Sequence, residues 1–452
     1  MDSPHSPSSS DRRSRRARLL AGGAAALLAG ALVAAAAQSA ESAPGAAAAH
    51  GGTGERGHAW VGTWATAPTT VPPSSDIVFE NQTLRQTVHV SLGGSVLRVR
   101  LTNEFGRTPL VVGEAHVARA AGGGAPSRGI APGTDRRLTF GGRASVTIPA
   151  GAPALSDPVR LSVPALSDLV VSMYLPRRTR LTTTHAFSFQ DNVAAAGNVT
   201  GRRTVTPTAT FQRWDFLSGV SVLAPRRAGA VVTLGDSITD GANTTPNTNS
   251  RWPDVLARRL QATAGLRHLG VLNVGISGNR LLHDPNPLPG SGAEAFAAFF
   301  GESALRRFDR DVAARPGARY LTVLIGVNDL GHAGTIAPES EEVSVADLIF
   351  GYRQLIARAH ERGLKIFGGT ITPFANDTFG FDTPENRAKR RAVNRWIRTS
   401  GEFDAVIDFD AAVRDPADPE RLRPAYDSGD HLHPNDAGMA AMARAVPLRL
   451  FR

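Results

Sequence analysis

The hydrophobic pattern of this chain changes near residue 228, and that change constrains the fold more than any other feature. From about residue 58 to residue 223, apolar and polar residues alternate in short runs, with no good amphipathic helix between them. Beyond residue 228, continuous apolar runs alternate with helix-like stretches. Period-two alternation is typical of strands with one buried face, whereas apolar runs between helices indicate a buried parallel sheet. The sequence therefore predicts an all-β region followed by an α/β domain.

The first region, residues 58–223, is predicted to be a β-sandwich or jelly roll. Residues 84–92 and 97–101 alternate on either side of Gly93-Gly94, which predicts a hairpin with one polar face. Further strand-like runs lie between Gly, Pro and Asp residues, at 110–117, 145–148, 159–163 and 169–175. Short strands at this spacing favour a sandwich or jelly roll.

The second region, residues 228–452, follows the junction Ala224-Pro225-Arg226-Arg227. Its predicted strands are 231–234, 271–274, 320–325, 364–371 and 405–409. Its predicted helices are 252–263, 345–362 and 385–399. Strands and helices in this alternation predict a parallel sheet that is covered by helices on both faces.

The N-terminal residues 1–37 have the pattern of an export signal. Five arginines between residues 12 and 18 precede the apolar run 19–37, and small residues near 35–37 suit cleavage. The arginine pair resembles a twin-arginine signal, and the competing interpretation is a retained membrane helix. We expect the signal to be removed, which predicts a secreted protein with no stable membrane span. Residues 38–57, rich in Ala, Gly and Ser, are predicted to be a flexible linker.

Length and composition restrict the remaining possibilities. A chain of 452 residues is too long for one ordinary domain. The net charge of +10 comes almost entirely from scattered arginines, and lysine occurs only at Lys365 and Lys389. Because no basic stripe is interleaved with aromatic residues, we expect no nucleic-acid partner. The chain has no cysteine, so it has neither disulfides nor thiolate metal sites. We expect a monomer.

The predicted strand 231–234 leads directly into Gly235-Asp236-Ser237, which makes Ser237 a candidate nucleophile. The serine would stand where a strand ends and a helix begins, the edge at which open α/β sheets bind ligands. The positive end of that helix favours negative charge developing on a substrate. Taken alone, such a tripeptide is more often a turn or a helix cap.

Three later loops contain the groups that a serine nucleophile needs. Gly278 follows the second predicted strand and offers a backbone N–H, and Asn328 follows the third and offers a side-chain amide. Near the C-terminus, Asp430 precedes His433 by three residues. Each feature also has an ordinary interpretation as a turn, a cap or a surface loop, and His431, His433 and Asp430 could instead bind a metal ion. Their order along one sheet favours a shared reaction site.

These motifs resemble those of the SGNH (GDSL-type) hydrolase family. Gly235-Asp236-Ser237 is similar to the family's first block, Gly278 in Gly-Ile-Ser-Gly-Asn to its second, and Gly326-Val-Asn328-Asp to its third. Asp430-x-x-His433-Pro is similar to its fifth block. The resemblance covers residues 228 to 452 and implies a flavodoxin-like α/β/α sandwich that hydrolyses esters. Together with the β-region, the chain resembles secreted bacterial GDSL-type esterases that carry an N-terminal β-domain.

The expected chemistry is that of a Ser-His-Asp triad with no metal and no organic cofactor. His433 would remove the Ser237 proton, and Asp430 would hold the imidazole in the right tautomer. The N–H groups of Ser237 and Gly278 and the amide of Asn328 would form the oxyanion hole. Within the same loop, Asp427 and His431 are the rivals of Asp430 and His433. The Asp-x-x-His spacing favours Asp430 and His433, because it lets both side chains lie on one side of a turn.

Several alternatives stay open at this level. The same site could transfer an acyl group to an alcohol, or the chain could be a polysaccharide-binding protein with an inactive hydrolase domain. A metallohydrolase acting through His431 and His433 is a further alternative. The substrate could be a small-molecule ester, a lipid or an acylated polysaccharide, with Arg280 and His332 as possible substrate contacts. In the β-region, Trp60, Trp64 and Trp214 could stack on sugar rings or pack in the core.

Overall fold

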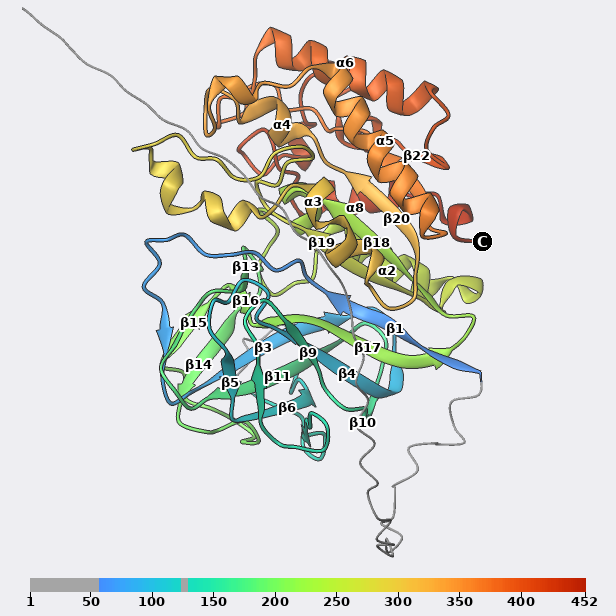
Figure 1. Ribbon diagram of the computed structural model, residues 1–452. Coiled ribbons are helices and arrows are strands. Elements are labelled where there is room, and N and C mark those ends of the chain that lie inside the picture. The colour runs from blue at the N-terminus through green and yellow to red at the C-terminus, as the bar shows by residue number, and fades with distance from the viewer. Residues whose placement is uncertain (1–56, 123–128) are drawn as a thin grey trace, which may run out of the picture. The chain divides into compact units, whose positions relative to one another are not determined.

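A computed structural model describes residues 57–122 and 129–452 of the chain. The predicted signal at residues 1–37 and nearly all of the predicted linker at 38–57 lie outside these residues. The described residues belong to one compact unit, which holds an antiparallel β-region and an α/β region (Figure 1). Among the described residues, none of the helices has the length and apolar character that crossing a membrane requires. The predicted domain boundaries stay predictions.

The β-region is built from two main antiparallel sheets. One has the order β1 (His58–Ala65), β17 (Leu217–Pro225), β4 (Gly94–Thr102) and β10 (Val159–Val163), with β9 (Pro153–Leu155) also on β4. The other has the order β15 (Ala209–Phe211), β14 (Asn192–Ala196), β3 (Gln82–Val90), β11 (Ser167–Leu175), β6 (Glu114–Arg119) and β7 (Arg136–Arg137). Alternate residues of β4 and β11, such as Leu97, Val99, Leu169 and Val171, are fully buried in one core. The predicted all-β region is confirmed.

The predicted hairpin at residues 84–101 is wrong, because β3 and β4 lie in different sheets. Strand β3 pairs with β11 and β14, whereas β4 pairs with β17, β9 and β10. Between them the chain crosses from one sheet to the other along β1. There the N–H groups of Ser91 and Leu92 donate to the carbonyl and hydroxyl of Thr63, at 2.9 and 2.8 Å. Two glycines after a strand permit a sharp turn but do not determine which partner the next strand finds.

The expected polar face of β3 is also buried. Arg85 has no exposed surface, and its guanidinium donates to the Ser172 hydroxyl at 3.1 Å. It also donates to the carbonyl oxygen of Arg202 at 2.7 Å. A buried guanidinium is tolerated when acceptors surround it in this way.

The α/β region contains a parallel sheet with the order β19 (Leu269–Gly275), β18 (Gly229–Gly235), β20 (Ala318–Leu324), β21 (Lys365–Gly369) and β22 (Ala405–Ile407). In chain order this is 2-1-3-4-5, the flavodoxin-like arrangement that the family resemblance implied. Helices α2 (Trp252–Ala262) and α8 (Asp436–Ala445) pack together, as do α5 (Val345–Glu361) and α6 (Pro384–Thr399). The predicted strand 405–409 ends early because Asp408 caps helix α7 (Phe409–Val413).

The β-region covers the edge strand β19 of the parallel sheet. The Ser91 hydroxyl accepts from the Val271 N–H at 2.9 Å and lies 3.0 Å from the Val271 carbonyl oxygen, to which it donates. Gly62 of β1 lies so close to β19 that an added Cβ would stand 2.6 Å from the Leu272 side chain. Because an open edge strand invites pairing with other chains, this cover protects the sheet. One continuous apolar core extends through both regions.

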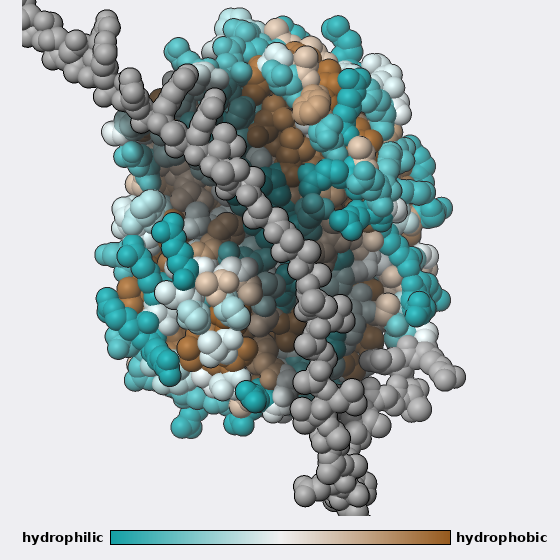
Figure 2. Space-filling view, in the orientation of Figure 1, coloured by the Kyte–Doolittle hydropathy of each residue, from teal (hydrophilic) through white to brown (hydrophobic). Residues whose placement is uncertain are grey.

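The surface follows the usual partition of polar and apolar residues. On the face seen in Figure 2, hydrophilic residues form most of the outline, and apolar residues show mainly toward the hollowed middle. Trp64 and Trp214 are 7% and 5% exposed and meet edge to face at 5.0 Å, so they pack in the core. The guanidinium of Arg98 lies 4.2 Å above the Trp60 ring.

Candidate active site

Ser237 is the first residue of α1 (Ser237–Asp240), directly beyond the carboxyl end of β18. Gly235 permits close packing at this strand end, since a Cβ at this position would stand 2.4 Å from the Leu324 carbonyl oxygen. The Asp236 carboxylate caps the helix by accepting from the Ile238 N–H at 3.0 Å. Burial raises the pKa of Asp236 to about 7, and the charge of Asp329 adds to this effect.

The structure brings His433 and Asp430 to Ser237 from the C-terminal loop. His433 Nε2 lies 2.8 Å from Ser237 Oγ, and His433 Nδ1 lies 2.6 Å from Asp430 Oδ2. The other Asp430 oxygen accepts from the backbone N–H groups of Leu432 and His433, at 3.0 and 2.8 Å. Burial alone would raise the pKa of Asp430, but the bonds and charge of His433 hold it well below its usual range. Asp430 is therefore an ionised acceptor for the imidazole.

The alternative pair in this loop, Asp427 and His431, bond to each other and not to Ser237. His431 Nδ1 lies 2.5 Å from Asp427 Oδ2, and the His431 side chain is 47% exposed. The two histidines therefore bond to different carboxylates, and only His433 bonds to the serine. Within residues 57–122 and 129–452, no group of three or more His, Asp or Glu side chains is arranged to hold a metal ion.

The predicted oxyanion donors lie in the loops after β19 and β20. Among the described residues, neither the Ser237 N–H nor the Gly278 N–H donates to a backbone carbonyl. Gly278 has a φ of +78°, and a Cβ there would stand 2.1 Å from the Phe300 ring. Asn328, in α4 (Val327–Gly331), donates one amide hydrogen to the Asn279 carbonyl at 2.9 Å. Because a side-chain amide has two hydrogens, the second stays available for a ligand.

Both predicted substrate contacts are buried. Arg280 is 3% exposed and bonds to Glu341 at 2.6 Å and to the carbonyl of Asp284, so it holds two loops together. His332 is also 3% exposed. Burial, followed by the charge of Arg280, lowers the pKa of His332 to about 3, which keeps the imidazole neutral. Their assignment as substrate contacts stays a prediction.

An aromatic wall beside the site was not anticipated from the sequence. Ring contacts at 5.5–5.9 Å connect, in order, His433, Phe379, Phe381, His332, Phe300 and Phe296. We call these six residues the aromatic arc. Its two outermost phenyl rings, Phe379 and Phe296, are 46% and 38% exposed. The clusters Phe296-Ala-Ala-Phe-Phe and Phe379-Gly-Phe were the signal available in the sequence, but nothing local showed that they meet.

The arrangement supplies the groups of nucleophilic acyl chemistry. A hydroxyl faces an imidazole base, the base is held by an ionised carboxylate, and backbone and amide donors lie nearby. The same arrangement of serine, imidazole and carboxylate occurs in unrelated folds. The role of each residue therefore follows from its position in the site and not from the fold. The structure also assembles the site from four loops at one end of a single sheet.

Part of the chain is similar to known proteins. Residues 233–441 match the model of the GDSL-like lipase/acylhydrolase family. No curated protein matches the chain. An acetylxylan esterase from Geobacillus stearothermophilus is similar at 21% identity, covering 49% of this chain and 93% of its own, with a TM-score of 0.36. A G-D-S-L family lipolytic protein from Desulfitobacterium hafniense is similar at 19% identity, covering 48% and 96%, with a TM-score of 0.33.

Proposed function

We propose that this serine ester hydrolase, whose residues 233–441 form a GDSL-like lipase/acylhydrolase domain, cleaves carboxylic esters through Ser237, His433 and Asp430. The observation that carries the proposal is the separation of 2.8 Å between His433 Nε2 and Ser237 Oγ, with Asp430 bonded to the far nitrogen at 2.6 Å. Among the side chains of the loop, this imidazole alone bonds to the serine. The proposed mechanism uses no metal and no organic cofactor.

The first half of the reaction forms an acyl-serine intermediate. Ser237 Oγ attacks the carbonyl carbon while its proton passes to His433 Nε2, and the carbonyl oxygen becomes an oxyanion. The carbon–oxygen bond to the alcohol then breaks, and His433 returns the proton to the leaving alkoxide. In the second half, His433 takes a proton from water, the hydroxide attacks the acyl carbon, and Ser237 leaves with that proton.

Electrostatics supports each charged species in this sequence. The ionised Asp430 stabilises the imidazolium that forms on His433, and its lowered pKa keeps it ionised over the working pH range. The N–H groups of Ser237 and Gly278 and the free hydrogen of Asn328 are proposed to bind the oxyanion. Loss of one such donor typically lowers kcat by about 100-fold or more.

The proposal is tested with Ser237→Ala and a serine-directed fluorophosphonate. The wild-type chain is expected to be labelled at one site and to hydrolyse p-nitrophenyl esters. The variant is expected to lose labelling and to lose kcat by roughly 10 000-fold or more. Equal activity in the two proteins, or activity that a chelator abolishes in both, would reject the serine mechanism.

We further propose that the substrate presents an apolar group to the aromatic arc. The exposed ring of Phe379 packs on His433 with ring centres 5.8 Å apart, so a group bound beside the base would touch it. Each methylene buried there contributes about 0.8 kcal/mol, or roughly a threefold to fourfold gain in kcat/KM per added carbon. A graded series of p-nitrophenyl esters, measured beside acetylated xylan, tests this expectation.

Phe379→Ala is expected to flatten the dependence on chain length, whereas Phe350→Ala should leave it unchanged. Phe350 is the matched control because it is also an exposed phenylalanine, 58% accessible, but belongs to α5 outside the aromatic arc. If the wild type hydrolysed acetyl esters best and gained nothing from longer acyl chains, this result would contradict an apolar binding surface.

The proposal extends to location and assembly. The basic residues and the apolar run within residues 1–37 favour export and removal of the signal, so the working enzyme would be extracellular. We separately propose that it is a monomer. N-terminal sequencing of protein from culture medium and light scattering of the purified enzyme test these two points. An intact N-terminus in a membrane fraction would contradict the first, and a stable dimer would contradict the second.

A further inference from the structure

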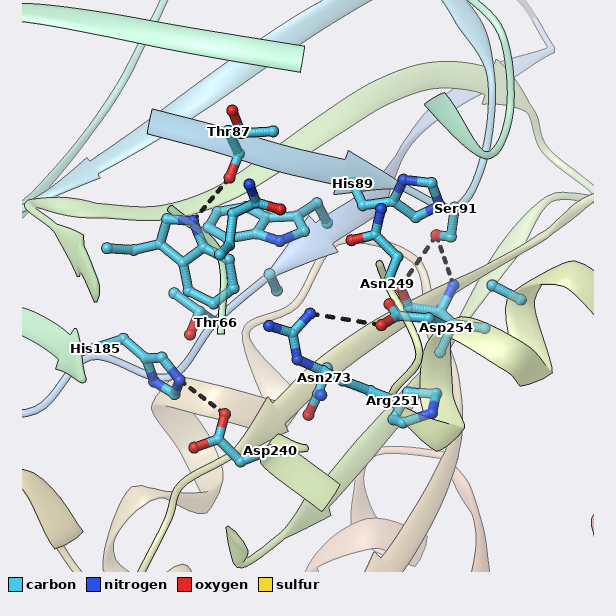
Figure 3. Close-up of a pocket in the computed structure, with 17 residues that line it drawn as sticks. Thr66, Thr87, His89, Ser91, His185, Asp240, Asn249, Arg251, Asp254 and Asn273 are labelled. Atoms are coloured by element: carbon cyan, nitrogen blue, oxygen red, sulfur yellow. Dashed lines mark hydrogen bonds and ion pairs between the residues drawn. The ribbon is translucent and has the colours of Figure 1, made fainter. Parts of the chain in front are cut away.

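A buried ion pair joins the β-region to the helix that carries the nucleophile. His185 of β13 (Thr184–Ala186) lies with its Nε2 3.0 Å from Asp240 Oδ1, and Asp240 is the last residue of α1 (Figure 3). Their side chains are only 3% and 4% exposed. The ring of Trp214 packs beside the imidazole, with centres 5.6 Å apart. Burying two charges is costly unless both are fully hydrogen-bonded, so such a pair needs an explanation.

Both ring nitrogens of His185 have a hydrogen-bond partner. Its Nδ1 lies 2.8 Å from the carbonyl oxygen of Ala67, and its Nε2 faces the Asp240 carboxylate. Both partners offer oxygen acceptors, so the imidazole can donate to each of them through a ring N–H. The pair therefore fixes the carboxylate of Asp240 in one orientation.

The second oxygen of Asp240 reaches the oxyanion loop. Oδ2 accepts from the Ser277 N–H at 3.0 Å and from the Ser277 hydroxyl at 2.7 Å. Ser277 directly precedes Gly278, whose N–H is one of the proposed oxyanion donors. A single carboxylate thus connects the four-residue helix of Ser237 to the turn that presents the second donor.

We propose that His185 is a positioning residue for the oxyanion hole, supplied by the β-region and acting through Asp240 and Ser277. This inference rests on the proposed function. It gives the β-region a part in the reaction: His185 holds Asp240, and Asp240 holds the peptide between Ser277 and Gly278 at the angle that stabilises the oxyanion. The oxyanion exists only after attack, so loss of this support lowers kcat and leaves KM unchanged.

The test compares His185→Phe with His185→Gln in the full chain. Phenylalanine keeps an aromatic ring beside Trp214 but removes both donors, and kcat is expected to fall by about 10- to 100-fold, since a small misplacement of a catalytic group has effects of this size. Glutamine restores one N–H toward Asp240 and is expected to recover most of kcat. His116→Phe is the matched control, because His116 is a buried β-region histidine bonded to Asp135 at 2.9 Å.

Two further measurements separate positioning from general destabilisation. Titration of reactive serines to completion with a fluorophosphonate counts the folded sites, so kcat is expressed per site. Hydrogen exchange of the peptide spanning residues 276–279 is expected to accelerate in His185→Phe, with exchange in β20 unchanged. The inference is supported if kcat per site falls in His185→Phe, if it recovers in His185→Gln, and if exchange at residues 276–279 is faster in His185→Phe.

Other outcomes overturn it. His185 has no positioning role if His185→Phe keeps wild-type kcat. The same conclusion holds if the activity lost in His185→Phe is explained entirely by fewer titrated sites and is not recovered in His185→Gln. Failure of the proposed function has a different signature, since the wild-type chain would then hydrolyse no ester or Ser237→Ala would keep its activity. In that case the exchange rates at residues 276–279 still decide whether His185 holds the turn: acceleration supports it, and no change overturns it.

Discussion

Two histidines two positions apart, His431 and His433, show how strongly local bonding decides the chemistry of a residue. His433 bonds to Ser237, whereas the half-exposed His431 bonds to Asp427. His433→Ala is expected to lower kcat by roughly 10 000-fold or more, because the base is lost. His431→Ala, the matched control, should keep wild-type kcat within a few-fold. Steady-state kinetics on one p-nitrophenyl ester decides this, and the reverse ranking of the two variants would contradict the assigned base.

His332 gives a prediction about stability and pH. Its pKa is about 3 in the folded chain, against about 6.5 in an unfolded chain, so the unfolded state binds the extra proton. Stability is therefore lost as the pH falls below 6.5, by about 2 kcal/mol between pH 8 and pH 5. Urea unfolding at several pH values should show that His332→Gln lacks this loss.

The measured quantity must be the difference in unfolding free energy between His332→Gln and wild type at each pH. The buried Asp236 changes the stability of both proteins with pH in the direction opposite to His332. Its pKa of about 7 exceeds the usual value near 3.9, so the folded state binds its proton more tightly. Its contribution to stability decreases as the pH rises from 4 toward 7. A difference between His332→Gln and wild type that stays constant from pH 8 to pH 5 would contradict the neutral, buried assignment.

At the level of elements, the junction of β18 and α1 places Ser237, and Gly235 packs tightly against β20 at this junction. Gly235→Ala is expected to destabilise the protein by about 1–3 kcal/mol, because the added methyl would overlap backbone of β20. The matched control is Gly265→Ala, whose methyl would meet no atom within 4 Å. Denaturant unfolding measures both, and equal stability of the two variants would show that the strand–helix turn relaxes freely.

The elements themselves were predictable to different degrees. Strands of the parallel sheet are short continuous apolar runs, so residues 231–234 and 271–274 were identified and the observed strands only extend them. The pairing of β3 was not predictable, because period two determines which side chains share a face but not which strand lies alongside. Strand β22 ends at Ile407 because Asp408 caps the next helix, whereas the apolar pattern predicted a strand to residue 409.

For the whole molecule, the contact between the two regions predicts shared stability. Arg315 is buried, and it donates to the carbonyls of Ser218 and Thr66 in the β-region, at 3.1 and 2.8 Å. One apolar core continues through both regions. Calorimetry is therefore expected to show a single cooperative transition for the two regions together, with equal calorimetric and van't Hoff enthalpies. Two resolved transitions would show that the regions unfold independently.

The sequence by itself determined the identity and order of the candidate reactive groups. The serine, the glycine and the amide follow the first three strands of the sheet, and the Asp-x-x-His pair follows the last. Parallel strands bring their carboxyl ends to one edge whatever the loop lengths. Local spacing also favoured Asp430 and His433 over their neighbours, because three residues are enough to form the turn that joins them.

Only the tertiary structure decided what meets across long separations. His185 and Asp240 are 55 residues apart and come from different regions, and the aromatic arc gathers rings from four separate loops. Such contacts cannot be predicted from the periodicity of the sequence. Packing between sheets depends on shape and buried area and not on the repeat of any one strand.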